Sequence, residues 1–103
     1  MNIDVFLKES DTKINNDSIR SFLEEKYKSK LFVAAQDGFW NADLPTISFL
    51  SSFTNPNLIL LDTVGNPVKV QREILLTELR HIYESVMEEW HNEYQTLANN
   101  LVI

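Results

Sequence analysis

The sequence predicts one two-layer α+β domain, with helices packed on one face of a four-stranded antiparallel sheet. Two short apolar segments are each interrupted by a turn that contains a glycine, which is typical of β-hairpins. Three amphipathic segments alternate with these hairpins, so the expected order is α-ββ-α-ββ-α. The chain has 103 residues, the size of a single domain, and no linker-like segment divides it.

Residues 1–15 begin with an apolar cluster and then turn polar. The cluster consists of Ile3, Val5, Phe6 and Leu7. We expect an N-terminal arm or a short strand here, with the single α+β domain spanning residues 16–103. Because such a cluster should not remain in water, we expect it to dock on its own domain or on a neighbouring subunit.

Residues 16–28 are predicted to form the first helix. Asn16 or Asp17 can cap it, because a short side-chain acceptor satisfies the free amides of the first turn. Its apolar face consists of Ile19, Phe22, Leu23 and Tyr27. Three lysines lie near its C-terminal end, where the helix dipole favours cations, at positions 26, 28 and 30.

Residues 31–43 are predicted to form the first hairpin, with LFVAAQ and FWNAD on either side of Asp37-Gly38. Asp-Gly supplies the positive φ values that a two-residue hairpin turn requires. The alternative is that the first helix continues to Gly38 as its C-cap, since residues 34–36 are compatible with a helix. We favour the hairpin.

Residues 43–53 are predicted to form a short helix. Asp43 can cap it, and Pro45 is tolerated in its first turn. Its apolar side consists of Ile47, Phe49, Leu50 and Phe53. The segment TNPN then ends the helix, because proline cannot continue it.

Residues 58–70 are predicted to form the second hairpin. LILLD is an apolar run suited to a central strand, and residues 63–66 form the turn. Val68 and Val70 point to one side of the return strand. Pro67 at its start suggests that this strand begins at an edge of the sheet.

Residues 71–99 are predicted to form one long amphipathic helix of about 40 Å. Its apolar stripe consists of Leu75, Leu79, Ile82, Val86, Trp90, Tyr94 and Leu97. This apolar stripe is longer than a helix needs in order to cover one sheet of a domain of this size. Either the helix is an ordinary core helix or its last turns form an interface with another chain.

The interface predicted from these patterns combines exposed aromatic side chains with the apolar C-terminal end. Phe39 and Trp40 are adjacent on a strand and point to opposite faces, so one of them should lie in the core. Large aromatic residues are enriched at interaction hot spots. The full predicted set is Phe39, Trp40, Met87, Trp90, Tyr94, Leu101, Val102 and Ile103.

The net charge of −6 is concentrated on the long helix, because residues 71–103 alone carry −4. Such a surface repels phosphate backbones, so we expect no direct contact with nucleic acid. It could attract a basic protein through an acidic face made of Glu84, Glu88 and Glu89. The chain has neither a membrane span nor a signal peptide, so we expect the cytoplasm of a host cell or a virion.

No catalytic or cofactor motif stands out, so we expect neither enzymatic activity nor a cofactor. Glu78-His81 and Glu88-His91 have the spacing of di-iron ligands, but both pairs belong to one helix and face apart. The chain has no cysteine and only two glycines, which excludes thiolate metal sites and phosphate-binding loops. The serines of residues 48–52 have no histidine nearby in the sequence.

The segments LFVAAQDGFWNA, LILLDTVGNPVKV and REILLTEL with YESVMEEW resemble small uncharacterised proteins of large tailed bacteriophages. The resemblance covers roughly residues 30–94 and lies in the pattern of hairpins and helices. It implies a minor virion component of the head, neck, tail or baseplate, or a small host-directed protein. Our hypothesis is a non-enzymatic assembly protein that acts by protein–protein contact or self-association. The alternative is an acidic inhibitor or immunity-type protein that blocks a basic target.

Overall fold

The computed structural model describes residues 12–101, and these residues follow the predicted order of helices and strands. The elements are α2 (Thr12–Lys30), β1 (Phe32–Ala35), β2 (Gly38–Asn41), α3 (Leu44–Ser51), β3 (Asn57–Leu61), β4 (Pro67–Gln71) and α4 (Arg72–Leu101). The prediction of an α+β fold with a long C-terminal helix is therefore confirmed. Most of the predicted N-terminal arm, together with Val102 and Ile103, lies outside the described residues.

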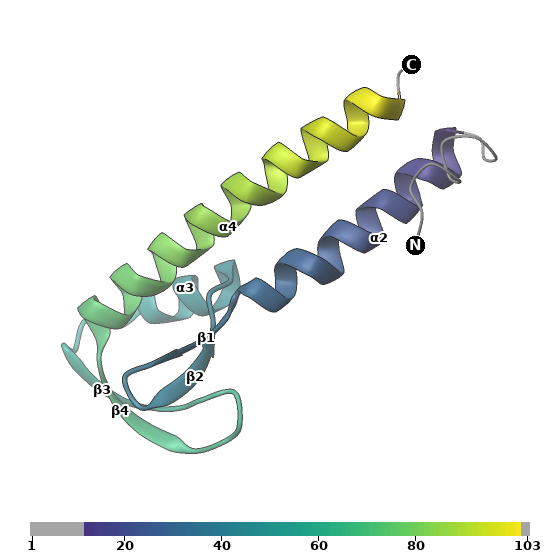
Figure 1. Cartoon of the computed structure of the whole chain (residues 1–103). Coiled ribbons are helices and arrows are strands. Elements are labelled where there is room, and N and C mark those ends of the chain that lie inside the picture. The colour runs from purple at the N-terminus through teal and green to yellow at the C-terminus, as the bar shows by residue number, and fades with distance from the viewer. Residues whose placement is uncertain (1–11, 102–103) are drawn as a thin grey trace.

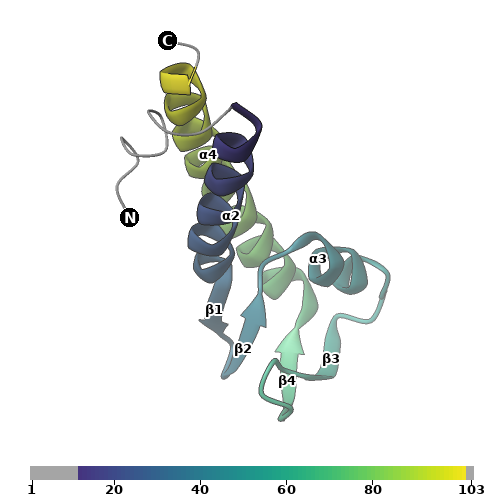
Figure 2. The same cartoon turned by 90° about the vertical axis from the view of Figure 1, so that its right-hand side faces the viewer.

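The molecule is elongated, with principal extents of 54, 21 and 17 Å. Helices α2 and α4 run antiparallel and side by side, and they project away from the hairpins (Figure 1). We call α2 with the C-terminal half of α4 the stalk. We call the two hairpins, α3 and the first turns of α4 the body, which lies at the opposite end (Figure 2).

The prediction of one four-stranded sheet is wrong, because the described residues form two separate two-stranded antiparallel sheets. In one, β1 pairs with β2, and in the other β3 pairs with β4. Nor do the helices form a layer over one sheet, since α2 packs on α4 beyond the hairpins (Figure 1).

Side chains bridge the two hairpins where a backbone ladder would otherwise form. The Gln36 amide accepts from the Gln71 N–H at 2.7 Å and donates to the Gln71 carbonyl at 3.2 Å. At the other contact, the Asp62 carboxylate accepts from the Phe39 N–H at 3.1 Å. Among the described residues, the backbone contact between the hairpins is the single bond from the Thr63 N–H to the Phe39 carbonyl at 2.9 Å, so no strand ladder joins them into one sheet.

The first turn is displaced by one residue from its predicted position. Gln36 and Asp37 are the central residues, with φ values of 46° and 63°, as a type I′ turn requires. Gly38 instead begins β2, where its missing side chain makes room for Trp40. A Cβ at Gly38 would lie 2.8 Å from Cζ2 of that ring. The alternative of a helix continuing to Gly38 is also wrong, since α2 ends at Lys30.

Helix α2 begins at Thr12, so Asn16 and Asp17 lie within the helix and the predicted cap at these residues is wrong. The cap of α3 is confirmed, because Oδ1 of Asp43 accepts from the Thr46 N–H at 3.0 Å. Pro45 lies in the first turn of α3 as expected. The most deeply buried large side chains come from four elements and are Leu23, Leu50, Val70, Leu75 and Leu79.

We expect Gly38→Ala to lower the free energy of unfolding by about 1–3 kcal/mol, because the added methyl group overlaps the buried Trp40 ring. Chemical denaturation measures this loss, and the near-ultraviolet circular dichroism of the tryptophan should change with it. Gly65→Ala is the matched control. Its Cβ meets nothing within 4 Å, so it carries only the strain of its φ of 87° and should leave the tryptophan signal unchanged. An unaltered signal in Gly38→Ala would contradict this account.

Candidate protein-binding surface

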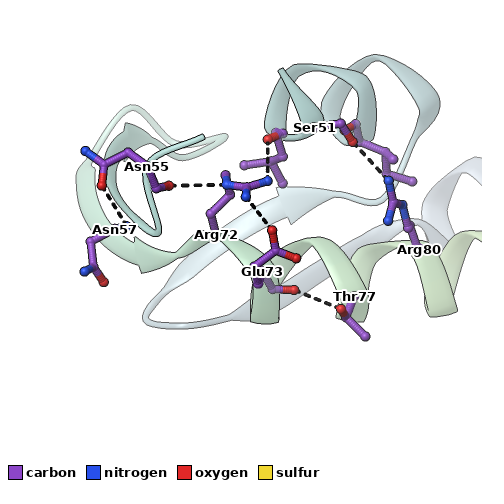
Figure 3. Close-up of polar contacts among 9 residues, drawn as sticks. Ser51, Asn55, Asn57, Arg72, Glu73, Thr77 and Arg80 are labelled. Atoms are coloured by element: carbon purple, nitrogen blue, oxygen red, sulfur yellow. Dashed lines mark hydrogen bonds and ion pairs between the residues drawn. The ribbon is translucent and has the colours of Figure 1, made fainter. Parts of the chain in front are cut away.

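Helix α3 is held on the start of α4 by two arginines. Nε of Arg72 donates to the Asn55 carbonyl at 3.2 Å, and its guanidinium also reaches the Leu50 carbonyl and the Glu73 carboxylate (Figure 3). Arg80 donates to Oγ of Ser51 at 3.2 Å (Figure 3). These contacts satisfy carbonyls at the C-terminal end of α3 and fix the loop that leads into β3.

Asp62 is the buried charged residue of the body, with 8% of its surface exposed. Its Oδ1 accepts from the N–H groups of Asn66 at 2.9 Å and Val64 at 3.1 Å, while Oδ2 accepts from Phe39. The Asn66 N–H has the largest effect on the pKa of Asp62 and lowers it. Burial opposes this shift, and the other amides reinforce it, so the carboxylate stays ionised.

A groove of about 330 Å³ lies between α3 and the two hairpins. Trp40 and Leu50 are the buried apolar residues that line it, while Pro45, Phe49 and Leu61 line it from exposed positions. Asp62 also lines the groove, but both of its oxygens already accept hydrogen bonds from backbone amides. The groove is therefore suited to an uncharged, largely apolar occupant.

Large apolar side chains are exposed around this groove and along β3. Phe49 is 52% exposed, and Ile59 and Leu61 are 72% and 70% exposed. Further exposed apolar residues of the body are Phe32, Phe39, Leu44, Val64 and Ile74. Exposed large apolar side chains gathered at one end of a molecule are typical of interaction sites in soluble proteins.

Of the predicted pair Phe39 and Trp40, the structure buries Trp40 and leaves Phe39 43% exposed. Nε1 of Trp40 donates to the Ala35 carbonyl at 2.8 Å, which satisfies the polar atom of the buried ring. The Phe39 ring stacks on Phe32, with 5.7 Å between the ring centres. Trp40 therefore belongs to the core, and Phe39 is the member of the pair that a partner can reach.

The aromatic residues predicted on the long helix lie in the stalk, away from the groove. Trp90 stacks on Tyr27 of α2 with 5.7 Å between ring centres, and Tyr94 is exposed. Met87 is half-buried. Trp90 and Tyr94 line a second groove of about 230 Å³ between α2 and α4. The side chain of Leu101 lies outside the described residues.

Lysines of α2 neutralise part of the acidic face. Nζ of Lys30 lies 3.0 Å from Glu89, and Nζ of Lys26 lies 2.7 Å from Glu93. Lys26 and then the Tyr27 hydroxyl lower the pKa of Glu93 by donating hydrogen bonds to it. Glu84 and Glu88 are exposed and form no ion pair with any residue between 17 and 99. The predicted acidic face is thus reduced to these two carboxylates.

Both histidines are exposed, and His91 has Gln95 as its neighbour at 3.3 Å. Within the described part of the chain, no three acidic or histidine side chains come close enough to hold a metal ion. None of the helices described is both long and apolar enough to cross a membrane.

No family model, no curated protein and no solved structure matches this chain.

Ile59 and Leu61 are exposed, although the apolar run LILLD predicts a central strand. A signal for their exposure was nevertheless present. Ile59 pairs with Lys69 and Leu61 pairs with Pro67, and paired residues share one face of a hairpin. Lys69 and Gln71, the polar residues of the return strand that pair with Ile59 and Asn57, therefore identify the outward face of β3. Phe49 was predicted only as part of an apolar helix face.

We expect the stability contributed by Asp62 to depend on pH. Because folding lowers its pKa, the contribution is fully present above the unfolded value of about 3.9 and is lost as the pH falls through the lower folded value. Asp62→Asn should lower the melting temperature at pH 7 and remove this part of the acid dependence. Thermal unfolding of both proteins between about pH 2 and 7 measures it. Asp37→Asn, at an exposed turn position, is the control and should behave as wild type.

Proposed function

We propose that this protein is a non-enzymatic assembly protein that works by contact with other proteins. The observation that carries the proposal is the apolar surface of the body, where Phe49, Ile59 and Leu61 are each more than half exposed around or beside a groove. Burying such side chains against a partner removes apolar surface from water, which is the main driving force for association.

We propose in particular that the protein is a minor component of a phage virion. The resemblance of residues 30–94 to small proteins of large tailed bacteriophages supports it. The elongated shape also supports it. The apolar body and the charged stalk lie at opposite ends of a molecule 54 Å long, so the two ends can contact different neighbours. The site of action would then be the virion, or the host cytoplasm during assembly.

In a lysate of the cells that naturally make it, we expect the wild-type chain to sediment with large particles in a fixed ratio. Phe49→Asp places a charge in the groove and should reduce the sedimenting fraction at least about tenfold. Ser48→Asp is the control, since it adds the same charge at the next exposed position of α3 and should keep wild-type behaviour. Mass spectrometry of the pellet and unchanged melting temperatures complete the measurement. A wild-type chain that stays unassociated in the lysate contradicts the proposal.

The exposed carboxylates of Glu84 and Glu88 favour a second candidate, an acidic inhibitor of a basic protein. The two residues lie one helical turn apart, so their charges act together. In this case the chain should migrate in the lysate as a small complex with one basic protein. That complex should dissociate between about 50 and 300 mM salt. Charge reversal of both residues to lysine should abolish it, while Glu25→Lys on α2 should not; an unchanged complex after the double reversal rejects this candidate.

A further inference from the structure

Strand β3 has one free edge, and the register of its hairpin shows which backbone groups lie there. The Asp62 N–H donates to the Asn66 carbonyl, and the Arg72 N–H donates to the Pro56 carbonyl. In an antiparallel pair, hydrogen-bonded and non-bonded residue pairs alternate along the strand. The bonded pairs of β3 are therefore the even-numbered residues, and Asn57, Ile59 and Leu61 point their backbone groups away from β4.

On the outer edge of β4 the backbone groups of Gln71 are occupied, whereas the outward backbone groups of Ile59 and Leu61 on β3 have no hydrogen-bond partner among the described residues. Gln71 lies opposite Asn57, and its outward N–H and C=O are both bonded to the Gln36 side chain. Among residues 12–101, no other element forms a hydrogen bond with the N–H or C=O of Ile59 or Leu61. The edge thus combines unpaired backbone groups with the two most exposed large apolar side chains described.

The edge also lacks the features that usually protect edge strands. Such strands typically carry a lysine, a proline or a bulge that discourages pairing with another chain. The return strand β4 has Pro67 and Lys69, but β3 reads NLILL and has no charged residue. The chain has a net charge of −6, but none of the five residues of β3 is charged, so two copies can meet at this strand without like-charge repulsion between the paired residues.

We propose that two copies of this protein pair through their β3 edges, antiparallel and about a two-fold axis at Ile59, so that their hairpins form one four-stranded sheet. The proposal deepens the proposed function and rests on it, by naming a second copy of the chain as the first partner in the assembly. Each hairpin by itself is a two-stranded sheet, and such sheets gain stability when further strands are added.

The register follows from the positions of the outward groups. Residues whose backbone N–H and C=O point away from β4 can bond only to residues of the same kind in the second copy. With the two-fold axis at Ile59, Ile59 therefore pairs with Ile59 of the second copy, and Asn57 pairs with Leu61 of the second copy. The Ile59 pair exchanges two N–H···O=C bonds, and so does each Asn57–Leu61 pair once the Asn57 N–H leaves Oδ1 of Asn55, to which it donates at 3.4 Å in the single chain. The three residues also share the outer face, so the Ile59 side chains become neighbours across the axis and shield each other from water.

The contact is small, because each copy contributes one strand of five residues. Interfaces well below the standard size belong to weak, reversible complexes. We therefore expect the dimer to form at protein concentrations of about 0.1–1 mM. Larger assemblies could then be stabilised through the remaining apolar surface of the body.

Sedimentation equilibrium of the purified chain measures this association. Ile59→Lys should weaken dimerisation at least about tenfold, because two lysines would face each other across the axis. Val64→Lys is the control, since Val64 is an exposed apolar residue in the turn, away from the edge, and its substitution should leave the association unchanged. Circular dichroism of both variants verifies that they fold. A wild-type chain that remains monomeric up to about 1 mM overturns the proposal.

Hydrogen exchange tests the edge itself. In the monomer, the amides of Ile59 and Leu61 face solvent, while those of Leu58 and Leu60 are bonded within the hairpin. Protection of the amides at 59 and 61 should therefore rise with protein concentration, and protection at 58 and 60 should not. A dimer in which the amides at 59 and 61 exchange as fast as in the monomer must use another surface, and this outcome also overturns the proposal.

Cysteine cross-linking tests the register, and the chain has no cysteine of its own. Residues of a bonded pair have Cα atoms about 5.5 Å apart, within the range that a disulfide spans. Ile59→Cys should therefore form a disulfide dimer under mild oxidation. Leu61→Cys is the control with nearly equal exposure, but its copies lie about 14 Å apart along the strands and should not cross-link. Equal cross-linking of both variants overturns the two-fold register.

These measurements use the purified chain alone, so they can fail independently of the proposed function. A dimer with the stated register that does not enter particles in the lysate would reject the assembly role and leave the β3 contact intact. A chain that enters particles but never pairs through β3 would reject this contact alone.

Discussion

The buried carboxylate of Asp62 is the interaction on which the arrangement of the body depends. It accepts two amides of its own turn and one from β2, so one charge closes the second hairpin and joins it to the first. The Thr63 N–H adds a bond to the Phe39 carbonyl at 2.9 Å. A buried carboxylate without these donors would be destabilising. The ionised Asp62 side chain therefore depends on the turn that supplies two of the N–H groups and on β2, which supplies the third. Asp62 also lines the groove beside α3, together with Trp40 from one sheet and Leu61 from the other.

Helix α4 contributes to one hydrophobic core along its whole length, from the body into the stalk. Leu75 and Leu79 near its start are buried in the body, whereas Val86 and Leu97 are buried in the stalk against α2. The stalk is closed by the stack of Tyr27 on Trp90 and by ion pairs from lysines of α2 to glutamates of α4. These ion pairs are exposed and contribute little to stability by themselves, but they neutralise two glutamates of a strongly acidic helix. The length of α4 is thus explained within one chain by its packing against α2.

The exposed apolar surface lies mainly on the body. It consists of a groove lined by aromatic and aliphatic side chains, an uncharged strand edge beside it, and exposed phenylalanines on β1, β2 and α3. Backbone hydrogen bonds at an open strand edge supply affinity, and neighbouring apolar pockets supply specificity, which is how many proteins add a strand from a partner. The stalk differs in being polar and charged on its outer side. This division between an apolar end and a charged end is consistent with the role in assembly that we propose.

The sequence by itself determined the local elements: their order, the cap at Asp43, the helical period of α4 and the two hairpins, because each depends on residues a few positions apart. It also predicted that one of Phe39 and Trp40 would lie in the core. Tertiary structure decided which one, through the space that Gly38 leaves for the Trp40 ring. It also decided that the hairpins would form two separate sheets that are connected through Gln36 and Asp62, and that Lys26 and Lys30 would pair with glutamates about 60 residues away. The physical reason is that short-range periodicity specifies which face of an element is apolar, whereas burial, ion pairing and sheet edges depend on which distant element covers that face.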